Sequence, residues 1–159
     1  MRIRVGIGYD SHRFVPGRPL VLGGHTVPHE AGLAGHSDAD ALAHAVTDAV
    51  LGAAKAGNIG QLFPDTDPRF KDADSIGLLR AAVARVGERG WRVAQVDATV
   101  VTQAPKLNPH VAEMERRLAE ALEVGEDCVS VKAKTNEGMG FLGRGEGLAV
   151  MAVAMLEAR

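Results

Sequence analysis

Alternation of apolar and polar positions predicts strands at several points along the chain. Residues 2–10 and 91–100 alternate as half-buried strands do, and residues 129–134 set apolar side chains on one face and polar side chains on the other. Residues 148–156 are apolar at every position, which is typical of a central strand covered on both faces. The chain therefore carries at least four strands.

Helical spacing of apolar residues predicts three main helices. The Ala-, Leu- and Val-rich run from Asp40 onward favours the first, and Ser37 with Asp40 three positions later forms a capping-box pattern. The second helix starts at caps within residues 72–75 and ends at Gly90, and Asn108 caps the third. The core positions of the last two helices are Ile76, Leu79, Val83, Val86, Val111, Met114, Leu118 and Leu122.

The order of these elements predicts an α+β fold in a single domain, residues 1–159. Three main helices cover one face of a small, mostly four-stranded mixed sheet, so we expect a sandwich with one free face. Because a large exposed apolar face is unusual on a monomer, we expect that face to be used in oligomer assembly. The alternative is a terminal strand with one poorly covered face. Short apolar pieces on either side of residues 23–25 also predict a small hairpin.

The composition limits the kinds of binding partner and the cellular compartment that we expect. A hydrophobic content of 46% fits a globular protein with a real core, and a net charge of −2 gives no general attraction to nucleic acid or membranes. Aromatic residues make up only 4% while glycines number 19, which favours a phosphate ligand held by backbone loops over a polynucleotide. The single Cys128 excludes an internal disulfide. We expect a cytoplasmic protein, because neither a signal-type nor a membrane-length apolar segment is present.

Two stretches carry ionisable side chains in a pattern typical of metal ligands. On the first predicted helix Asp40, His44 and Asp48 recur every fourth residue and share one face. Asp10 and His12 are two positions apart on the first strand and point to the same side. One carboxylate and two imidazoles would leave a fourth position open, as catalytic zinc sites do. The same set describes non-haem iron oxygenases, and a simple core histidine is the alternative for His44 alone.

The residues around this constellation favour phosphate chemistry. Free backbone N–H groups at a helix start near Ser37 can bind an anion, with His36 adding a donor, although a simple cap is the alternative. The glycine-rich residues 138–147 suit a binding loop but fit no P-loop pattern. Further polar side chains that suit phosphate oxygens are Lys106, Lys134, Thr135, Glu137 and Arg144.

Taken together, the motifs of the chain resemble those of the 2-C-methyl-D-erythritol 2,4-cyclodiphosphate synthases. The resemblance covers essentially the whole chain and depends on an ordered combination of short motifs. These motifs are Asp10-Ser11-His12, His36-Ser37-Asp38-Ala39-Asp40 with His44, Phe63-Pro64-Asp65-Thr66-Asp67, Gln103-Ala104-Pro105-Lys106, Thr135-Asn136-Glu137 and Phe141-Leu142-Gly143-Arg144-Gly145-Glu146-Gly147.

The resemblance implies an enzyme of non-mevalonate isoprenoid biosynthesis, a cyclising, CMP-releasing phosphorus–oxygen lyase that depends on divalent metals. Such an enzyme converts 4-diphosphocytidyl-2-C-methyl-D-erythritol 2-phosphate to 2-C-methyl-D-erythritol 2,4-cyclodiphosphate by attack of the 2-phosphate on the β-phosphate. The resemblance also implies a homotrimer with active sites between adjacent subunits.

Roles for individual residues follow from the same resemblance. The expected ligands of one zinc ion are Asp10, His12 and His44. Glu137 is expected to help hold a magnesium or manganese ion on the substrate's diphosphate, and His36 and Thr135 are expected to stabilise the transition state. Asp40 is a candidate for substrate hydroxyls or for the helix start, and Asp48 for fixing the ring tautomer of His44.

Three binding surfaces complete these expectations. The methylerythritol phosphate part is expected near the metal ligands Asp10 and His12, at His36, Ser37, Asn58, Ile59, Gly60, Phe63, Pro64, Asp65, Thr66 and Asp67. The cytidine diphosphate pocket is expected at Thr102, Gln103, Ala104, Pro105, Lys106, Leu107, Asn108, Ala133, Lys134, Thr135, Asn136 and Glu137. Phe141 and Arg144 match residues that line a cavity on the trimer axis, where family members hold an isoprenoid diphosphate.

Three positions depart from residues found at the matching positions of relatives, namely Asn58, Asn108 and Lys134. All three positions lie in the expected binding pockets, whereas the residues expected to bind metal are those found in relatives. Two other functions stay open from the residues alone. One is an iron oxygenase built on the same three ligands, and the other is a non-enzymatic oligomer that binds a phosphorylated metabolite.

Overall fold

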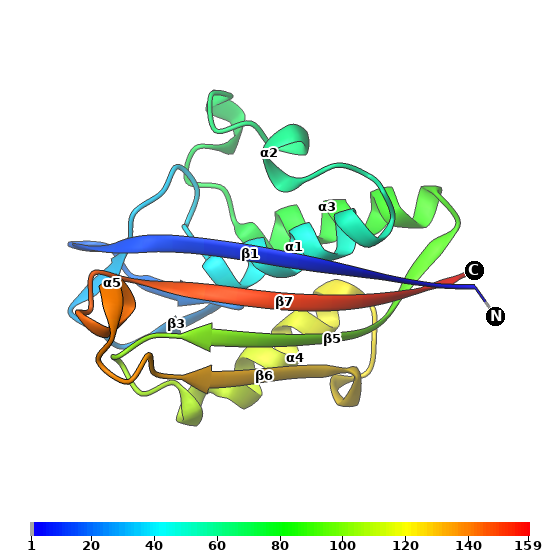
Figure 1. Cartoon of the computed structure of the whole chain (residues 1–159). Coiled ribbons are helices and arrows are strands. Elements are labelled where there is room, and N and C mark those ends of the chain that lie inside the picture. The colour runs from blue at the N-terminus through cyan, green and yellow to red at the C-terminus, as the bar shows by residue number, and fades with distance from the viewer. Residues whose placement is uncertain (1) are drawn as a thin grey trace.

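A five-stranded mixed sheet, covered by helices on one face, organises the computed structural model, which describes residues 2–159 (Figure 1). The strand order is β4-β1-β7-β5-β6, in which only the β5–β6 pair is parallel. The strands of this sheet are β1 (Ile3–Pro16), β4 (Ala31–Leu33), β5 (Trp91–Val101), β6 (Val129–Lys134) and β7 (Gly147–Ala158). The expected α+β class is therefore confirmed.

The expectation of a mostly four-stranded sheet is wrong by one short strand. β1 continues past residue 10 to Pro16, and its far end pairs with β4, where Phe14 lies opposite Leu33. The sequence pattern does not reveal β4, because a strand of three residues is too short to show alternation. The predicted small hairpin is present as β2 (Leu20–Leu22) and β3 (His25–Val27).

Three long helices pack against the sheet, as predicted, but two of them begin later than expected. They are α1 (Ala41–Ala53), α3 (Ser75–Glu88) and α4 (Val111–Leu122). Asp40, and not Ser37, caps α1, because its carboxylate accepts a hydrogen bond from the N–H of Ala43 at 2.9 Å. A 3-10 turn, η2 (Asn108–His110), precedes α4, so Asn108 starts that turn and not the α-helix.

Short helical elements interrupt the remaining connections. The long loop after α1 contains α2 (Ile59–Leu62) and the 3-10 turn η1 (Pro68–Phe70), η3 (Glu126–Cys128) precedes β6, and the glycine-rich loop before β7 contains α5 (Gly140–Gly143). No helix of residues 2–159 is long and apolar enough to cross a membrane.

Two glycines bring α1 unusually close to β1. A Cβ atom on Gly8 would lie 1.8 Å from the backbone oxygen of Ala45, and one on Gly6 would lie 2.1 Å from the backbone oxygen of Ala49. Only glycine leaves room for a helix backbone at this distance. Because Asp10 and His12 follow on the same side of β1 and His44 lies on α1, this contact places the predicted metal ligands beside one another.

The outward face of β1 carries the apolar side chains that its inner face lacks. Ile7 is 79% exposed and lies opposite Val153 of β7, which is 44% exposed. Tyr9 likewise lies opposite the exposed Met151. The full set of exposed apolar residues on these two strands is Ile3, Val5, Ile7, Tyr9, Met151 and Val153. Within one chain, the outward face of β7 is therefore uncovered at Met151 and Val153, whereas Ala149 on the same face is buried with Val101 and Leu142.

Candidate metal centre and two flanking pockets

Asp10, His12 and His44 meet in one half-buried cluster. Their ligand atoms all lie within 4.8 Å of one another, and no other group of this kind occurs within residues 2–159. The Oδ2 atom of Asp10 is 2.8 Å from Nε2 of His12 and 3.1 Å from Nδ1 of His44. The sequence pattern that predicted the three metal ligands thus corresponds to side chains that converge on one point.

Electrostatics keep Asp10 in the form that binds cations. Burial opposes its ionisation, but hydrogen bonds and positive charge from the two histidines outweigh burial and hold the pKa of the Asp10 carboxyl below its usual range. Burial also opposes protonation of His12, and Asp10 outweighs that effect, so the pKa of His12 is raised. The cluster therefore favours a positive charge beside an ionised carboxylate.

The contacts of His12 show that a metal cation fits between these groups. Its Nδ1 atom lies 2.6 Å from the carbonyl oxygen of Ala34, and a carbonyl only accepts, so Nδ1 donates its proton there. In the neutral ring, Nε2 then directs a lone pair at Oδ2 of Asp10, and only a proton or a cation makes that contact favourable. Two imidazoles and one carboxylate with an open fourth position are a donor set that suits zinc.

A pocket of about 360 Å³ opens beside the cluster and collects many of the residues expected to bind the methylerythritol phosphate part. Of the expected residues, it is lined by His12, His36, Ser37, His44, Ile59, Gly60, Phe63 and Asp65. The sequence did not reveal three further lining residues, Gly35, Phe70 and Leu78. Phe70 lies in η1 within the long loop and Leu78 lies in α3, and no motif of the chain connects them with the metal ligands.

Several residues of the expected set serve the local structure instead. Asn58 caps α2 by accepting from the N–H of Gln61 at 2.9 Å, and Asp67 binds Arg69 in an ion pair of 2.6 Å. That pair holds the pKa of Asp67 below its usual range. These two residues do not line the pocket, nor do Pro64 and Thr66.

The role of Asp40 as a binding residue for substrate hydroxyls is wrong for this structure, because its side chain is fully buried. The carboxylate accepts from the backbone N–H groups of Gly23 at 2.8 Å, Gly24 at 2.7 Å and Ala43 at 2.9 Å. It thereby joins the turn of the β2–β3 hairpin to the start of α1. The same carboxylate occupies the helix start that we expected to bind phosphate. The prediction of a phosphate site at the N–H groups of that helix start is therefore also corrected.

Asp48 does not fix the ring of His44 as predicted. Its Oδ1 atom accepts from the N–H of Ile59 at 2.7 Å and so anchors α2. Burial raises the pKa of Asp48, against the hydrogen bond from Ile59 that lowers it. The Nε2 atom of His44 lies instead 2.8 Å from the hydroxyl of Ser75, a residue that the sequence indicated only as a helix cap.

A second pocket, of about 390 Å³, lies where β5 and β6 end and contains most of the expected nucleotide-binding residues. The Thr102 hydroxyl donates to the carbonyl oxygen of Ala104 at 2.7 Å, and the Gln103 side chain accepts from the N–H of Asn136 at 2.9 Å, which ties the two connecting loops together. The lining residues are Thr102, Gln103, Pro105, Lys106, Leu107, Asn108, Pro109, Ala133, Lys134 and Thr135.

Glu137 does not join the cluster of Asp10, His12 and His44 within this chain. It follows β6 in the left-handed region with a φ of 54°, and its N–H donates to the hydroxyl of Thr135 at 3.3 Å. The predicted second metal ligand therefore lies next to this second pocket. Neither Glu137 nor Asn136 lines that pocket directly.

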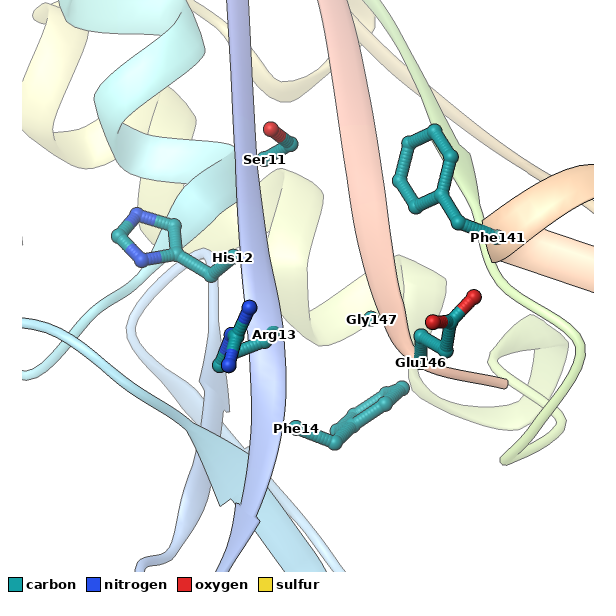
Figure 2. Close-up of a pocket in the computed structure, with 7 residues that line it drawn as sticks. All are labelled: Ser11, His12, Arg13, Phe14, Phe141, Glu146 and Gly147. Carbon is teal, nitrogen blue, oxygen red and sulfur yellow. The ribbon is translucent and has the colours of Figure 1, made fainter. Parts of the chain in front are cut away.

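A third cavity, of about 450 Å³, opens on β1 and the glycine-rich loop (Figure 2). Phe141 and Glu146 lie across β7 from Ser11 and Arg13. Arg144, predicted to line a cavity together with Phe141, binds Glu146 in an ion pair of 2.9 Å and is not itself among the lining residues.

The fold and the cluster define a helix-backed α+β protein with a candidate three-ligand metal site of one aspartate and two histidines. Residues 3–157 match the YgbB family. The chain is 58% identical over 157 residues to the 2-C-methyl-D-erythritol 2,4-cyclodiphosphate synthase of Dechloromonas aromatica, covering 99% of this chain and 98% of that one. The chain therefore belongs to the YgbB family.

Solved structures agree with this assignment. A CDP-bound 2C-methyl-D-erythritol-2,4-cyclodiphosphate synthase superposes with a TM-score of 0.89 at 39% identity, over 97% of this chain and all of that one. The bifunctional IspDF from Campylobacter jejuni superposes with a TM-score of 0.96 at 44% identity. That match covers 99% of this chain but only 43% of the bifunctional protein.

Proposed function

We propose that the chain is a metal-dependent cyclodiphosphate synthase that converts 4-diphosphocytidyl-2-C-methyl-D-erythritol 2-phosphate to 2-C-methyl-D-erythritol 2,4-cyclodiphosphate and CMP. The observation that carries the proposal is the convergence of Asp10, His12 and His44 beside a pocket that contains His36 and Ser37. The names of the relatives and of the solved structures support it.

The proposed reaction needs no nucleophile from the protein. An oxygen of the substrate's own 2-phosphate forms a bond to the β-phosphorus, while the bond from that phosphorus to the oxygen bridging the α-phosphate breaks and its electrons leave with CMP. Zinc held by Asp10, His12 and His44 would supply Lewis-acid polarisation of a phosphate oxygen. The chain then has to hold the negatively charged 2-phosphate and diphosphate close together, with the attacking oxygen and the leaving oxygen in line at the β-phosphorus.

Side chains of the two pockets provide that positioning. Ser37 lines the metal-side pocket and supplies a hydroxyl for phosphate oxygens, while the Nε2 atom of His36 lies 3.3 Å from the Asp67 carbonyl, which orients its ring. Lys106 and Lys134 bring positive charge to the second pocket, where Thr135 adds a hydroxyl. In this proposal Glu137, just beyond Thr135, holds magnesium or manganese on the diphosphate.

A homotrimer with active sites between subunits forms part of the proposal. β1, which carries two metal ligands, is separated from β6 by β7 and β5, so roughly 14 Å lies between these strands within one chain. The exposed apolar face formed by Ile7, Tyr9, Met151 and their neighbours supports assembly, because such faces are usually covered by a partner. A second copy of the chain seated there brings one subunit's nucleotide pocket to its neighbour's metal centre.

The direct test is incubation of the purified chain with the cytidylylated substrate, Zn²⁺ and Mg²⁺, followed by phosphorus NMR. We expect CMP and the cyclic diphosphate to appear in equal amounts. Absence of both products from a zinc-loaded protein contradicts the proposal, as does stoichiometric iron with oxygen-dependent turnover.

Mixed oligomers test where the active site lies. We expect His44→Ala and Lys106→Ala chains, each inactive alone, to recover about a quarter of wild-type activity when refolded together in equal amounts. Half of the subunits have an intact metal centre and the other half an intact nucleotide pocket, so random assembly joins the two at about a quarter of the subunit interfaces. The measurement is CMP release from the mixture, with each variant refolded alone as the control. If each active site lies within one chain, the mixture stays inactive.

A further inference from the structure

A relay of hydrogen bonds through the buried Ser75 to the partly buried Asp38 holds the far side of the His44 ring. Its Nε2 atom lies 2.8 Å from Oγ of Ser75, the first residue of α3, which is fully buried. The Ser75 hydroxyl donates in turn to Oδ1 of Asp38, and the Ser75 N–H donates to Oδ2 of Asp38 at 3.0 Å. Asp38 thus accepts hydrogen bonds from both the hydroxyl and the backbone N–H of Ser75.

The chemistry of these groups determines where the protons lie. An ionised carboxylate only accepts, so the single hydroxyl proton of Ser75 is committed to Asp38. The Ser75 oxygen can then only accept from His44, which requires a proton on Nε2. A neutral ring with its proton on Nε2 has its free lone pair on Nδ1, the atom that lies 3.1 Å from Oδ2 of Asp10.

We propose that Ser75 and Asp38 are positioning residues that fix the His44 tautomer, so that Nδ1 is always presented to the metal. The inference deepens the proposed function and rests on it for the use of the metal, but the relay itself is independent of turnover. Hydrogen-bonded partners of this kind set both the orientation and the basicity of a metal-bound imidazole.

Ser37 makes a weaker second contact with the same nitrogen. Its Oγ atom lies 3.2 Å from Nε2 of His44, and it also accepts from the N–H of Ala39 at 3.2 Å. Because both contacts can use the lone pairs of Ser37, its own proton stays available to the metal-side pocket that it lines. Ser75 is therefore the stronger determinant of the tautomer.

The first test compares Ser75→Ala with Asp74→Ala. Asp74 caps α3 by accepting from the N–H of Ile76 at 3.1 Å, whereas the relay to His44 runs through Ser75. We expect Ser75→Ala to weaken zinc binding by about 10- to 100-fold in competition with a chelator, because the Nε2 proton loses its acceptor. Asp74→Ala should lower the Tm, because α3 loses a cap, but it should leave zinc affinity within about twofold of wild type. Equal zinc affinities for the two variants would overturn the proposal.

The second test reads the tautomer directly and does not depend on the folding of Ser75→Ala. In ¹⁵N–¹H correlation spectra of the full chain loaded with Zn²⁺, we expect the wild-type His44 proton on Nε2, protected from exchange by its acceptor Ser75. Asp38→Asn places an amide donor near Ser75, so the Ser75 hydroxyl turns to His44 and no longer accepts the Nε2 proton; we expect that proton to exchange faster and zinc affinity to fall. An unprotected wild-type Nε2 proton, or an Asp38→Asn variant whose spectrum and zinc affinity match wild type, contradicts the proposal.

Discussion

Replacement of His44 by alanine is expected to abolish zinc binding and to lower turnover by on the order of 10³-fold. Metal polarisation of a phosphate oxygen lowers the activation barrier by several kcal/mol, and each 1.4 kcal/mol of barrier corresponds to a tenfold change in rate. His44 is the only ligand of the cluster that comes from α1, while Asp10 and His12 both come from β1. The measurements are metal content by mass spectrometry and CMP release followed by phosphorus NMR.

His25→Ala provides the matched control for this result. His25 is another partly buried histidine, but its Nε2 atom lies 2.9 Å from Nδ1 of His110 and outside the cluster. We expect this variant to keep its zinc and its turnover. If His44→Ala retained wild-type zinc content, or turned over at the wild-type rate without it, the assignment of the metal centre would be wrong.

Replacement of Asp40 by alanine is expected to have the largest effect on stability. The variant loses the cap of α1, worth about 1 kcal/mol, and leaves the N–H groups of Gly23 and Gly24 without a partner at about 1–3 kcal/mol each. We therefore expect the free energy of unfolding to fall by about 3–7 kcal/mol. Urea denaturation at one fixed protein concentration measures it, since assembly makes stability depend on concentration.

Asp74→Ala is the matched control for Asp40, because it removes a cap of α3 that accepts only one hydrogen bond. The control should cost about 1 kcal/mol. Equal losses for Asp40→Ala and Asp74→Ala would show that the turn of the β2–β3 hairpin gains nothing from the buried carboxylate.

The effect of Asp40→Ala is also expected to depend on pH. Burial raises the pKa of Asp40 from its usual 3.8 to about 6, against hydrogen bonds from Ala43, Gly24 and Gly23 that lower it. A carboxyl whose pKa is raised by folding stabilises the folded state below its unfolded pKa, and that stabilisation is lost as the pH rises through the folded pKa. The difference in unfolding free energy between wild type and Asp40→Ala should therefore be larger at about pH 5 than at about pH 7.5. A difference that grows with rising pH contradicts this expectation.

Much of the fold could be predicted because its long elements repeat a simple period. The stripe from Val111 to Leu122 predicted α4 with an error only at its start, and the alternation of residues 129–134 predicted β6 with its observed bounds. β4 escaped detection because three residues carry no period. The start of α1 was misplaced at Ser37 because the capping pattern is local, whereas Asp40 is held by the N–H groups of a distant hairpin turn.

The metal ligands could be predicted for a similar reason, and their surroundings could not. Asp10 and His12 follow from the period of a strand, His44 follows from the period of a helix, and the resemblance to known synthases joined the three as ligands of one ion. The contact between Ser75 and His44 joins residues 31 positions apart, and the sequence around Ser75 indicates only a helix start. Spacing along a chain identifies residues on one element, but it does not identify which residue of another element packs against them.

The glycine contact between α1 and β1 makes the packing of the fold and the geometry of the metal ligands sensitive to the same substitutions. Because Gly6 and Gly8 let the two backbones touch directly, no flexible side chain lies between the elements that carry Asp10 and His44. A methyl group added at Gly8 would meet the backbone of α1, so strand and helix would have to move apart and the spacing of Asp10 and His44 would change with them. A substitution at either glycine therefore acts on packing and on the geometry of the metal ligands together.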